Sequence, residues 1–425
     1  MKKKLTPQLQ KIQKQLDQIA AAFRQQMAAE NYPQAAAEAL RAHKLIPAAV
    51  APLSDAATAA VKGGMWQDGI TYAKKALQRN PDHINSLDAL SHAYGGLEDW
   101  ENCRTYGRRA LELRDQKVAA QTPPPFTRVP PKAGGKNIIA FSLFGGKSAY
   151  IEPAVLNTEL AGELYPGWVC RFYIDGSVPE TAVARLAANG AEIVRIDESL
   201  QHWPGTMWRF LAVDDAEAAY VVFRDADSVI SAREAQAVNE WMAGGKTFHT
   251  MRDAGTHTEL ILAGMWGAVG GSIPDMRGKI EAYLQQPLES SHFADQFFLR
   301  DHIWAYVRQD VCGHDRLFGF HGAQPFSDTE MTDYAHNHIG CDEGNSRFDA
   351  PYPLPDGSRV VWKLYSKIAP CLNADGSVRI TDTERKICEY ETVVANGRVS
   401  GEIPRRYSKG FALSASRMLV AEVKG

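Results

Sequence analysis

The sequence predicts an α/β domain that is preceded by an all-α repeat array and followed by a small β-rich appendage. Three observations carry this prediction. Residues 1–120 contain a repeat, residues 137–350 alternate apolar strand-like runs with helical stretches, and residues 351–425 contain hairpin signals. A Pro/Gly-rich stretch, residues 121–136, is expected to be a stiff linker between the first two regions.

The composition is that of an ordinary globular protein, with 45% hydrophobic and 23% charged residues in a chain of 425. The 47 Lys and Arg residues nearly balance the 50 Asp and Glu residues, so a net charge of −3 provides no bulk attraction for nucleic acid. No apolar run approaches the ~20 residues of a membrane span. The six cysteines are scattered without any C-x-x-C pair, which is typical of reduced thiols. We therefore expect a soluble, cytoplasmic protein.

The repeat consists of an aromatic residue and a small residue that each recur every 34 positions: Tyr32, Trp66 and Trp100, and Ala42, Ala76 and Ala110. Over roughly residues 14–115 this pattern resembles tetratricopeptide repeats, in which two antiparallel helices form one unit. The resemblance implies three repeats whose groove binds a peptide or protein. The alternative is that the repeats only brace the next domain or a dimer.

The second region predicts a mostly parallel sheet covered by helices on both faces. Strands are expected at residues 137–144, 168–174, 191–196 and 219–223, with a helical stretch after each of them. In sheets of this kind, ligands bind beyond the carboxyl ends of the strands.

The strongest chemical signal lies at the end of the last of these strands. Asp225 and Asp227 follow an apolar run directly, and residues two apart in an extended segment point the same way. Two carboxylates that converge at one point, with open positions beside them, suit Mg²⁺ or Mn²⁺ bound together with phosphate oxygens. An isolated D-x-D is more often a solvated turn, but the buried strand before it favours a functional site.

At this point the chain resembles a bacterial family of GT-A glycosyltransferases, over roughly residues 137–350. The matching segments are Phe141–Gly145, Tyr165–Trp168, Arg171–Asp175, Trp208–Phe210, Phe223–Ser228, Phe248–Asp253, Gly264–Gly267 and Ala294–Gln296. The resemblance implies a nucleotide-sugar donor, of the UDP or GDP type, that is bound through the D-x-D motif and Mn²⁺ or Mg²⁺.

The resemblance also implies where the donor lies. Ser142, Leu143 and Phe144 would form the base pocket, with Tyr150 as a stacking or hydrogen-bonding partner. Asp175 would contact the ribose or base, although an Asp before a glycine is also a common turn residue.

Two arginines are candidates for the diphosphate. Arg209 is favoured, and Arg224 stays open, because it can equally pair with Asp225 or Asp253. The resemblance further implies that Asp225 contacts the ribose or reaches the metal through water, and that Asp227 binds the metal directly.

The sugar and acceptor side is expected in the polar segments after residue 248. The candidates there are Arg252, His257, Gly264, Trp266 and Gln296, with Asp253 and Asp295 as the catalytic carboxylates. For Trp266 a packed ring at a Gly-bordered turn is an equal alternative, and for Asp295 the alternative is a helix cap. The resemblance also implies a third metal ligand. We predict His314 for it, and His321 and Asp342 are the other candidates.

The sequence therefore predicts a metal-dependent glycosyltransferase that moves a sugar to a protein or glycan acceptor recruited by the repeats. The alternative is a non-catalytic adaptor whose repeats bind a partner and whose α/β domain is an inactive scaffold. The β-rich appendage shows no catalytic constellation. Its expected hairpins, at Asn373–Gly376 and Asn396–Gly397, would cover the acceptor side or a sheet edge.

Overall fold

The computed structural model describes residues 6–288, 290, 293–327, 338–373 and 376–423. The chain forms two compact units, which are described separately. The repeat unit comprises residues 1–124, 251–260 and 313–338, and the sheet unit comprises residues 125–250, 261–312 and 339–425. Two segments of the region predicted as the transferase domain thus belong to the unit that contains the repeats.

The first part of the repeat unit is helical, as the period of 34 predicts. Its helices are α1 (Pro7–Ala28), α2 (Tyr32–Leu45), α3 (Ala51–Lys62), α4 (Trp66–Leu77), α5 (Ile84–Gly96) and α6 (Trp100–Ala119). The repeated aromatic residues are the first residues of α2, α4 and α6. Ala76 and Ala110 have no exposed surface, because neighbouring helices pack closely there, whereas Ala42 is partly exposed.

Segments from far along the chain pack against the third repeat. Three contacts attach them to α5 and α6: Ser91 Oγ donates to the Gly255 carbonyl at 2.7 Å, Arg104 Nε donates to the Leu317 carbonyl at 2.6 Å, and Arg114 pairs with Glu259 at 3.2 Å. The chain's own residues therefore occupy this face of the third repeat.

Gly107 in α6 shows how close this packing is. A Cβ atom added there would lie 2.2 Å from the Phe318 ring and 2.6 Å from Ser91 Oγ. We expect Gly107→Ala to destabilise the protein by about 1–3 kcal/mol, because the buried ring cannot move aside. Gly162→Ala in an exposed part of α7 (Ser148–Leu164) is the matched control, since an added Cβ meets nothing within 4 Å.

The control is expected to stabilise the protein by roughly 0.5–1 kcal/mol through helix propensity alone. Thermal and chemical unfolding of both variants measure the two changes. Stabilisation by Gly107→Ala would show that Phe318 does not pack on α6.

The sheet unit is built on a seven-stranded sheet in the order β3-β2-β1-β4-β6-β5-β7. Its strands are β1 (Lys136–Leu143), β2 (Trp168–Ile174), β3 (Glu192–Arg195), β4 (Ala218–Arg224), β5 (Phe248–Arg252), β6 (Trp266–Val269) and β7 (Val311–Asp315). The first four are parallel to one another, whereas β6 is antiparallel to both of its neighbours, β4 and β5. Chain order reverses between β1 and β4, which is where such sheets bind ligands.

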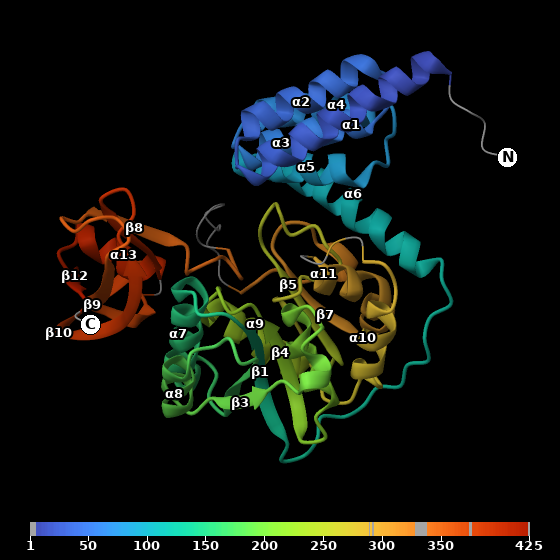
Figure 1. Cartoon of the computed structure of the whole chain (residues 1–425). Coiled ribbons are helices and arrows are strands. Elements are labelled where there is room, and N and C mark those ends of the chain that lie inside the picture. The colour runs from blue at the N-terminus through green and yellow to red at the C-terminus, as the bar shows by residue number, and fades with distance from the viewer. Residues whose placement is uncertain (1–5, 289, 291–292, 328–337, 374–375, 424–425) are drawn as a thin grey trace. The chain divides into compact units, whose positions relative to one another are not determined.

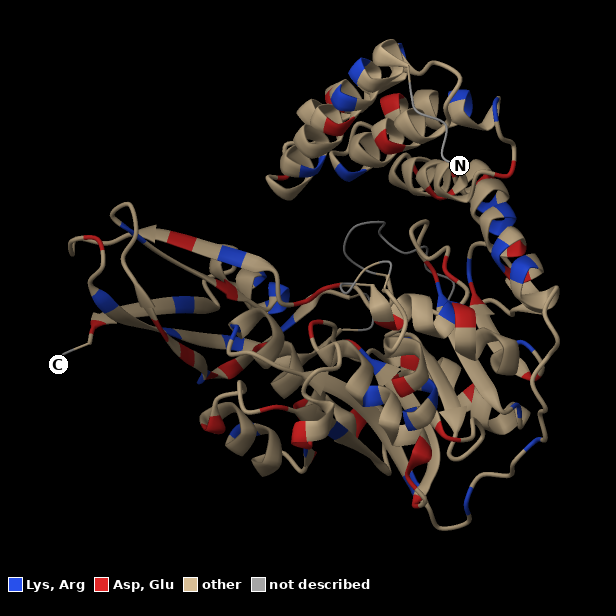
Figure 2. Ribbon diagram, turned by 45° about the vertical axis from the view of Figure 1, so that its right-hand side comes forward, with Lys and Arg blue, Asp and Glu red and all other residues tan. Residues whose placement is uncertain are grey.

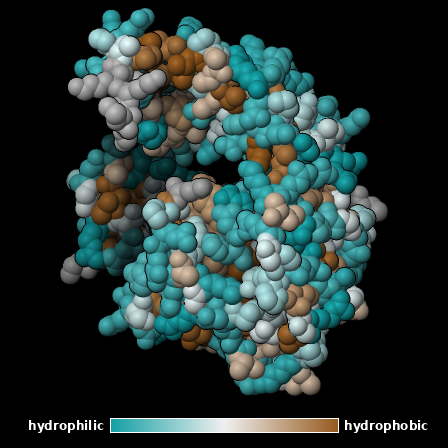
Figure 3. Space-filling view, turned by 90° about the vertical axis from the view of Figure 1, so that its right-hand side faces the viewer, coloured by the Kyte–Doolittle hydropathy of each residue, from teal (hydrophilic) through white to brown (hydrophobic). Residues whose placement is uncertain are grey.

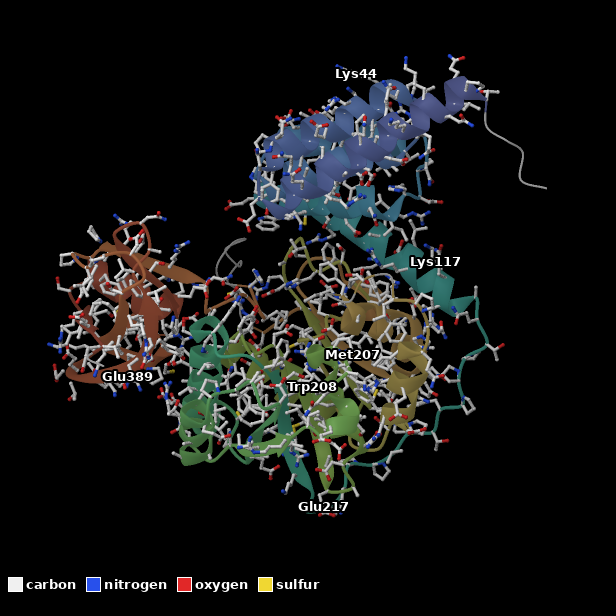
Figure 4. The ribbon with its side chains drawn as sticks, in the orientation of Figure 1. Lys44, Lys117, Met207, Trp208, Glu217 and Glu389 are labelled. Atoms are coloured by element: carbon white, nitrogen blue, oxygen red, sulfur yellow. The ribbon has the colours of Figure 1, made fainter. Side chains whose placement is uncertain are left out.

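Helices cover both sides of this sheet (Figure 1). They are α7, α8 (Glu180–Ala188), α9 (Ala232–Gly244), α10 (Met276–Leu284), α11 (Ala294–Phe298) and α12 (Trp304–Val307). The unit also contains the 3-10 helices η1 (Glu198–Leu200) and η2 (Gly205–Asp214) and the π-helix η3 (Leu299–Ile303), and the repeat unit contains the 3-10 helix η4 (Phe320–Gly322). The stretch predicted as a helix near Met207 is a 3-10 helix, η2. In Figure 4, Met207 and Trp208 lie within the unit and Glu217 lies at its lower edge.

The core of the sheet unit lies between the strands and the covering helices. Phe141 and Phe172 stack at 4.7 Å between ring centroids on neighbouring strands, and both are fully buried. The predicted linker is not a free spacer in its second half. Arg128 forms two hydrogen bonds with the Asp310 carboxylate, at 2.9 and 2.6 Å, and the Phe126 ring packs on Phe248.

The C-terminal part is mostly antiparallel β-structure, as predicted. Its elements are β8 (Ser346–Pro351), β9 (Arg359–Leu372), β10 (Val378–Val393), β11 (Arg398–Ile403), α13 (Arg405–Ala412) and β12 (Ser416–Glu422). Strands β10, β9 and β12 form one sheet and β11 and β8 another. Asn396 and Gly397 both have positive φ, as the tight turn predicted there requires. The other expected turn includes residues 374–375, which lie outside the described residues.

The surface carries charges of both signs. Lys and Arg lie close to Asp and Glu along the long C-terminal strands (Figure 2), and Arg417 and Glu384 pair there at 2.6 Å. The face shown in Figure 3 is mainly hydrophilic, with scattered hydrophobic side chains. Among the residues that the structure describes, no helix has the length and apolar character needed to cross a bilayer.

Candidate active site

The end of β4 is fixed by a buried ion pair. Arg224, the last residue of the strand, donates from Nε to the Glu234 carboxylate in α9 at 2.9 Å, and both side chains are almost fully buried. Since the Arg224 guanidinium is directed to this structural pair, it is not available to a diphosphate. The pair holds the strand end from which Asp225 and Asp227 extend.

Arg209 from η2 connects the first of these carboxylates to a second one from α11. Its Nη1 group donates to the Asp225 carboxylate and, at 2.9 Å, to the Arg224 carbonyl, while its Nη2 group lies 3.2 Å from Asp295. Its side chain is 2% exposed, and its Nε has no hydrogen-bond partner among the described residues. Ser142 at the end of β1 accepts a hydrogen bond from the Arg209 backbone N–H at 3.0 Å, so β1 positions this arginine.

Asp227 lies in a strongly acidic environment. Burial, followed by the nearby carboxylates of Asp225 and Asp342, raises the pKa of Asp227 to about 7. The chain after the pair is held by Asn157 of α7, which donates to the Ser228 carbonyl and accepts from the Ile230 N–H, both at 2.8 Å. The Asp227 carboxylate is therefore held close to other negative charges, and a bound cation would reduce this repulsion.

The third carboxylate comes from the segment before β8. Ser228 and Asp342 pair as a single antiparallel bridge, and the Glu343 N–H donates to the Asp227 carbonyl at 2.8 Å. Burial raises the pKa of Asp342. Of the three candidates for a third metal ligand, Asp342 lies beside the pair, whereas His314 and His321 belong to the repeat unit.

Gly264 makes room for Asp225. A Cβ atom added to this glycine would lie 2.1 Å from Asp225 Oδ2, so only glycine fits between the strand end and the loop before β6. Gln296 holds the same loop, because its side chain accepts from the Ala263 N–H at 3.1 Å and donates to the Ile261 carbonyl. Both residues, which were predicted for the sugar or acceptor, shape the backbone beside the carboxylates.

The residues predicted for the base differ in exposure. Phe144 is 43% exposed and packs with its edge against Trp208, and Tyr150 is 42% exposed. Burial, and next the negative charge of Asp227, raises the pKa of Tyr150. Leu143 is buried in the core, and Asp175 accepts a hydrogen bond from the Ser177 N–H at 3.0 Å, in a turn.

Trp266, predicted for the sugar or acceptor, and Asp295, predicted as catalytic, are both buried. Trp266 has no exposed surface and stacks on Phe223 at 4.2 Å between ring centroids, so it is a core residue and offers no face to a sugar. Asp295 is 7% exposed and bonded to Arg209; burial raises its pKa and the guanidinium opposes that rise.

The remaining predicted residues, Arg252, Asp253, His257 and His314, belong to the repeat unit. Arg252 is buried and donates to the carbonyls of His257, Glu259 and Leu260, at 3.3, 2.9 and 2.9 Å. It thereby shapes the loop that packs on the third repeat. The other three are also buried, and Gln324 hydrogen-bonds to the His314 ring at 2.9 Å.

The side chains at the end of β4 suit a hard divalent cation, because carboxylate oxygens are the ligands that Mg²⁺ and Mn²⁺ prefer. Asp225, Asp227 and Asp342 supply them, and the space beside Gly264 accommodates the first. Their present arrangement is not a finished metal site, since among the described side chains no group of three or more His, Cys, Asp or Glu is placed to hold a metal.

Sequence reasoning did not single out Asn157 or Glu343, which hold the chain at Asp227 and directly after it. An asparagine inside a helical stretch gives no local signal of such a role. Glu343 is next to Asp342 in sequence, but its partner lies more than 60 residues away.

Comparisons with known proteins give a limited result. No protein-family model and no curated protein matches this chain. Similar solved structures include an O-GlcNAc transferase of Thermobaculum terrenum, with 14% identity and a TM-score of 0.26 over 47% of this chain and 43% of that one. Another is the glucosyl-3-phosphoglycerate synthase of Mycobacterium tuberculosis in complex with Mg²⁺ and uridine diphosphate, with 15% identity and a TM-score of 0.28 over 47% of this chain and 74% of that one.

The Sgt2 TPR domain of Aspergillus fumigatus is similar at 18% identity and a TM-score of 0.23, over 30% of this chain and 93% of that domain. The chain spans less than half of the length of the first of these structures. The similar structures are thus glycosyltransferases and a repeat domain, and a likeness this weak carries no argument about the activity of this chain.

Proposed function

We propose that the sheet unit is a metal-dependent glycosyltransferase that transfers a sugar from a UDP- or GDP-type nucleotide-sugar to a protein or glycan acceptor. The observation that carries the proposal is the carboxylate pair at the end of β4, at the point where chain order reverses in the sheet, with Asp342 beside it. Three carboxylates in one half-buried place repel each other, and a divalent cation bound with a diphosphate removes that repulsion.

Asp227 is the residue proposed to hold the metal directly, with Asp342 and Asp225 as further oxygen ligands. When bound, Mn²⁺ or Mg²⁺ neutralises charge on the diphosphate and makes it a better leaving group. Arg209 keeps Asp225 and Asp295 in place by pairing with both. In this proposal Asp295 is directed at the sugar carbon or the acceptor hydroxyl.

Phe144 and Tyr150 are proposed to contact the nucleotide base, since both rings are partly exposed and the charge of Asp227 acts on the Tyr150 hydroxyl. Ser142 acts through Arg209 by fixing its backbone. Asp253 remains a proposed catalytic group and His314 a proposed metal ligand. Both proposals rest on the sequence alone, and both residues belong to the repeat unit.

The repeats are proposed to recruit the acceptor through α1 to α4. The third repeat is occupied by the chain's own segments, which supports a bracing role for that repeat. The competing function is a non-catalytic adaptor. In an inactive scaffold, three carboxylates that repel each other would serve no purpose. Their presence together therefore favours the enzyme over the adaptor.

Thermal unfolding with UDP or GDP, each with and without Mn²⁺, separates the two functions. We expect one nucleotide to raise the melting temperature only when Mn²⁺ is present, because ligands that bind only the folded state stabilise it. At 100 times the dissociation constant, the stabilisation would be about 2.7 kcal/mol. No shift with any combination would favour the adaptor.

A further inference from the structure

A buried ion pair connects the C-terminal part to the candidate site. Arg406 of α13 donates to the Glu343 carboxylate from its backbone N–H at 2.9 Å and from Nε at 2.8 Å. Both side chains are 6% exposed. Arg406 also donates to the Pro370 carbonyl of β9, and the neighbouring Arg405 N–H donates to the Glu343 carbonyl at 2.7 Å. Glu343 is thus attached to the C-terminal part through both its backbone and its side chain.

The same residue is attached to the carboxylate pair. Its N–H donates to the Asp227 carbonyl at 2.8 Å, next to the bridge between Ser228 and Asp342. The loop that carries Asp342, Glu343 and Gly344 also lies directly against α7, because a Cβ atom on Gly344 would be 1.8 Å from the Ala149 carbonyl oxygen. This leaves the loop little freedom to shift while its contacts are intact.

The side chain of Asp342 depends on this loop for its direction. Its Oδ1 accepts from the Gly344 N–H at 2.8 Å, and its Oδ2 accepts from the Asn345 side chain. Both partners lie within the loop itself. The connection of the loop to the rest of the molecule therefore determines where the Asp342 carboxylate lies relative to Asp227.

We propose that Glu343 is a positioning residue and that Arg406 of the C-terminal part, by pairing with it, holds the Asp342 carboxylate beside Asp227. The C-terminal appendage then completes the site, and does not merely cover a sheet edge. This inference rests on the proposed function, since it assigns the pair a role in binding the metal at that site.

Physical chemistry explains why one contact has this effect. A buried carboxylate that loses its partner is strongly unfavourable, so it turns toward water and takes its backbone with it. In Glu343 that backbone carries the hydrogen bond to Asp227. Residues that orient metal ligands in this way typically change metal affinity by about 10–100-fold when they are replaced.

The test compares two buried arginines of the full-length protein. Arg406→Met removes the partner of Glu343. Arg171→Met is the matched control, because Arg171 is 7% exposed and pairs at 2.6 Å with both Glu192 and Asp215. Asp215 precedes β4 and accepts a hydrogen bond from the Glu217 N–H at 2.8 Å, so it lies at the opposite end of that strand from Asp225. Glu217 is labelled at the lower edge in Figure 4.

The probe is Mn²⁺ alone, with the unbound ion measured by electron paramagnetic resonance. We expect Arg406→Met to weaken Mn²⁺ binding by about 10–100-fold and Arg171→Met to leave it unchanged, even if both variants are destabilised. Equal Mn²⁺ affinity in wild type and folded Arg406→Met would overturn the inference and leave the proposed function standing. Wild-type protein that binds no Mn²⁺, either alone or with UDP or GDP, would overturn both.

A second series covers the case in which Arg406→Met does not fold. Glu343→Gln keeps an acceptor oxygen for Arg406, whereas Glu343→Ala removes it. We expect Mn²⁺ affinity to fall in the order wild type, Glu343→Gln, Glu343→Ala. Equal affinities across this series would contradict a positioning role.

Discussion

Asp227→Ala is expected to abolish sugar transfer while leaving the fold intact. The substitution removes the proposed direct metal ligand, and with it the charge neutralisation of the leaving diphosphate. Such electrostatic losses typically reduce the rate by about 10²–10³-fold or more. Donor hydrolysis or transfer with Mn²⁺, measured beside a melting curve of the metal-free protein, tests both parts.

The stability half of this prediction follows from the pKa of Asp227. The pKa of Asp227 is raised from 3.8 to about 7, so ionising this carboxylate in the folded protein lowers the free energy of unfolding. The loss begins as the pH rises above 3.8 and is complete above pH 7. Without metal at pH 8, Asp227→Ala should therefore be at least as stable as wild type. Asp301→Ala, which removes an exposed carboxylate of the sheet unit, is the control that should keep activity. Near-normal turnover of Asp227→Ala would refute the metal-dependent mechanism.

Arg209→Met is expected to have the largest effect on stability. It leaves the Asp295 carboxylate, 7% exposed, without the charge that its Oδ2 contacts at 3.2 Å. Removing one partner of a buried ion pair typically costs about 3–5 kcal/mol. Chemical unfolding with urea at pH 8 measures the loss.

The deficit should depend on pH. Burial already raises the pKa of Asp295, and Arg209 opposes the rise, so the pKa will rise further in the variant. A carboxyl group with a raised pKa destabilises the fold only at pH values at which it is ionised in the unfolded chain. The loss of stability should therefore be small near pH 4 and complete at pH 8. Adding Asp295→Asn to Arg209→Met should recover part of the loss at pH 8. A deficit that is the same at both pH values would argue against an ionised Asp295.

The strands and the carboxylate pair were predictable because their signals are local. Buried parallel strands form continuous apolar runs, and Asp225 and Asp227 follow one of them directly. The period of 34 likewise predicted the helical N-terminal region, because the spacing of the aromatic residues alone marks the start of every second helix.

The surroundings of the site were less predictable because they depend on long-range contacts. Trp266 and Arg252 belong to residue types common at ligand sites, yet one packs in the core and the other bonds to three carbonyls of its own loop. Asn157 and Glu343 hold the backbone at Asp227 and directly after it, and their side-chain contacts reach residues that lie 71 and 63 positions away in the sequence. No periodicity or motif marks such contacts.

The central claim is that the carboxylates at the end of β4 bind a divalent metal together with a nucleoside diphosphate. A crystal of the full-length protein soaked with Mn²⁺ and either UDP or GDP tests it most directly, because the anomalous signal locates the ion. We predict a manganese peak in contact with Asp227, with the diphosphate beside it. A nucleotide bound away from β4, or no manganese at Asp225, Asp227 or Asp342 in a crystal that holds the nucleotide, would contradict the account.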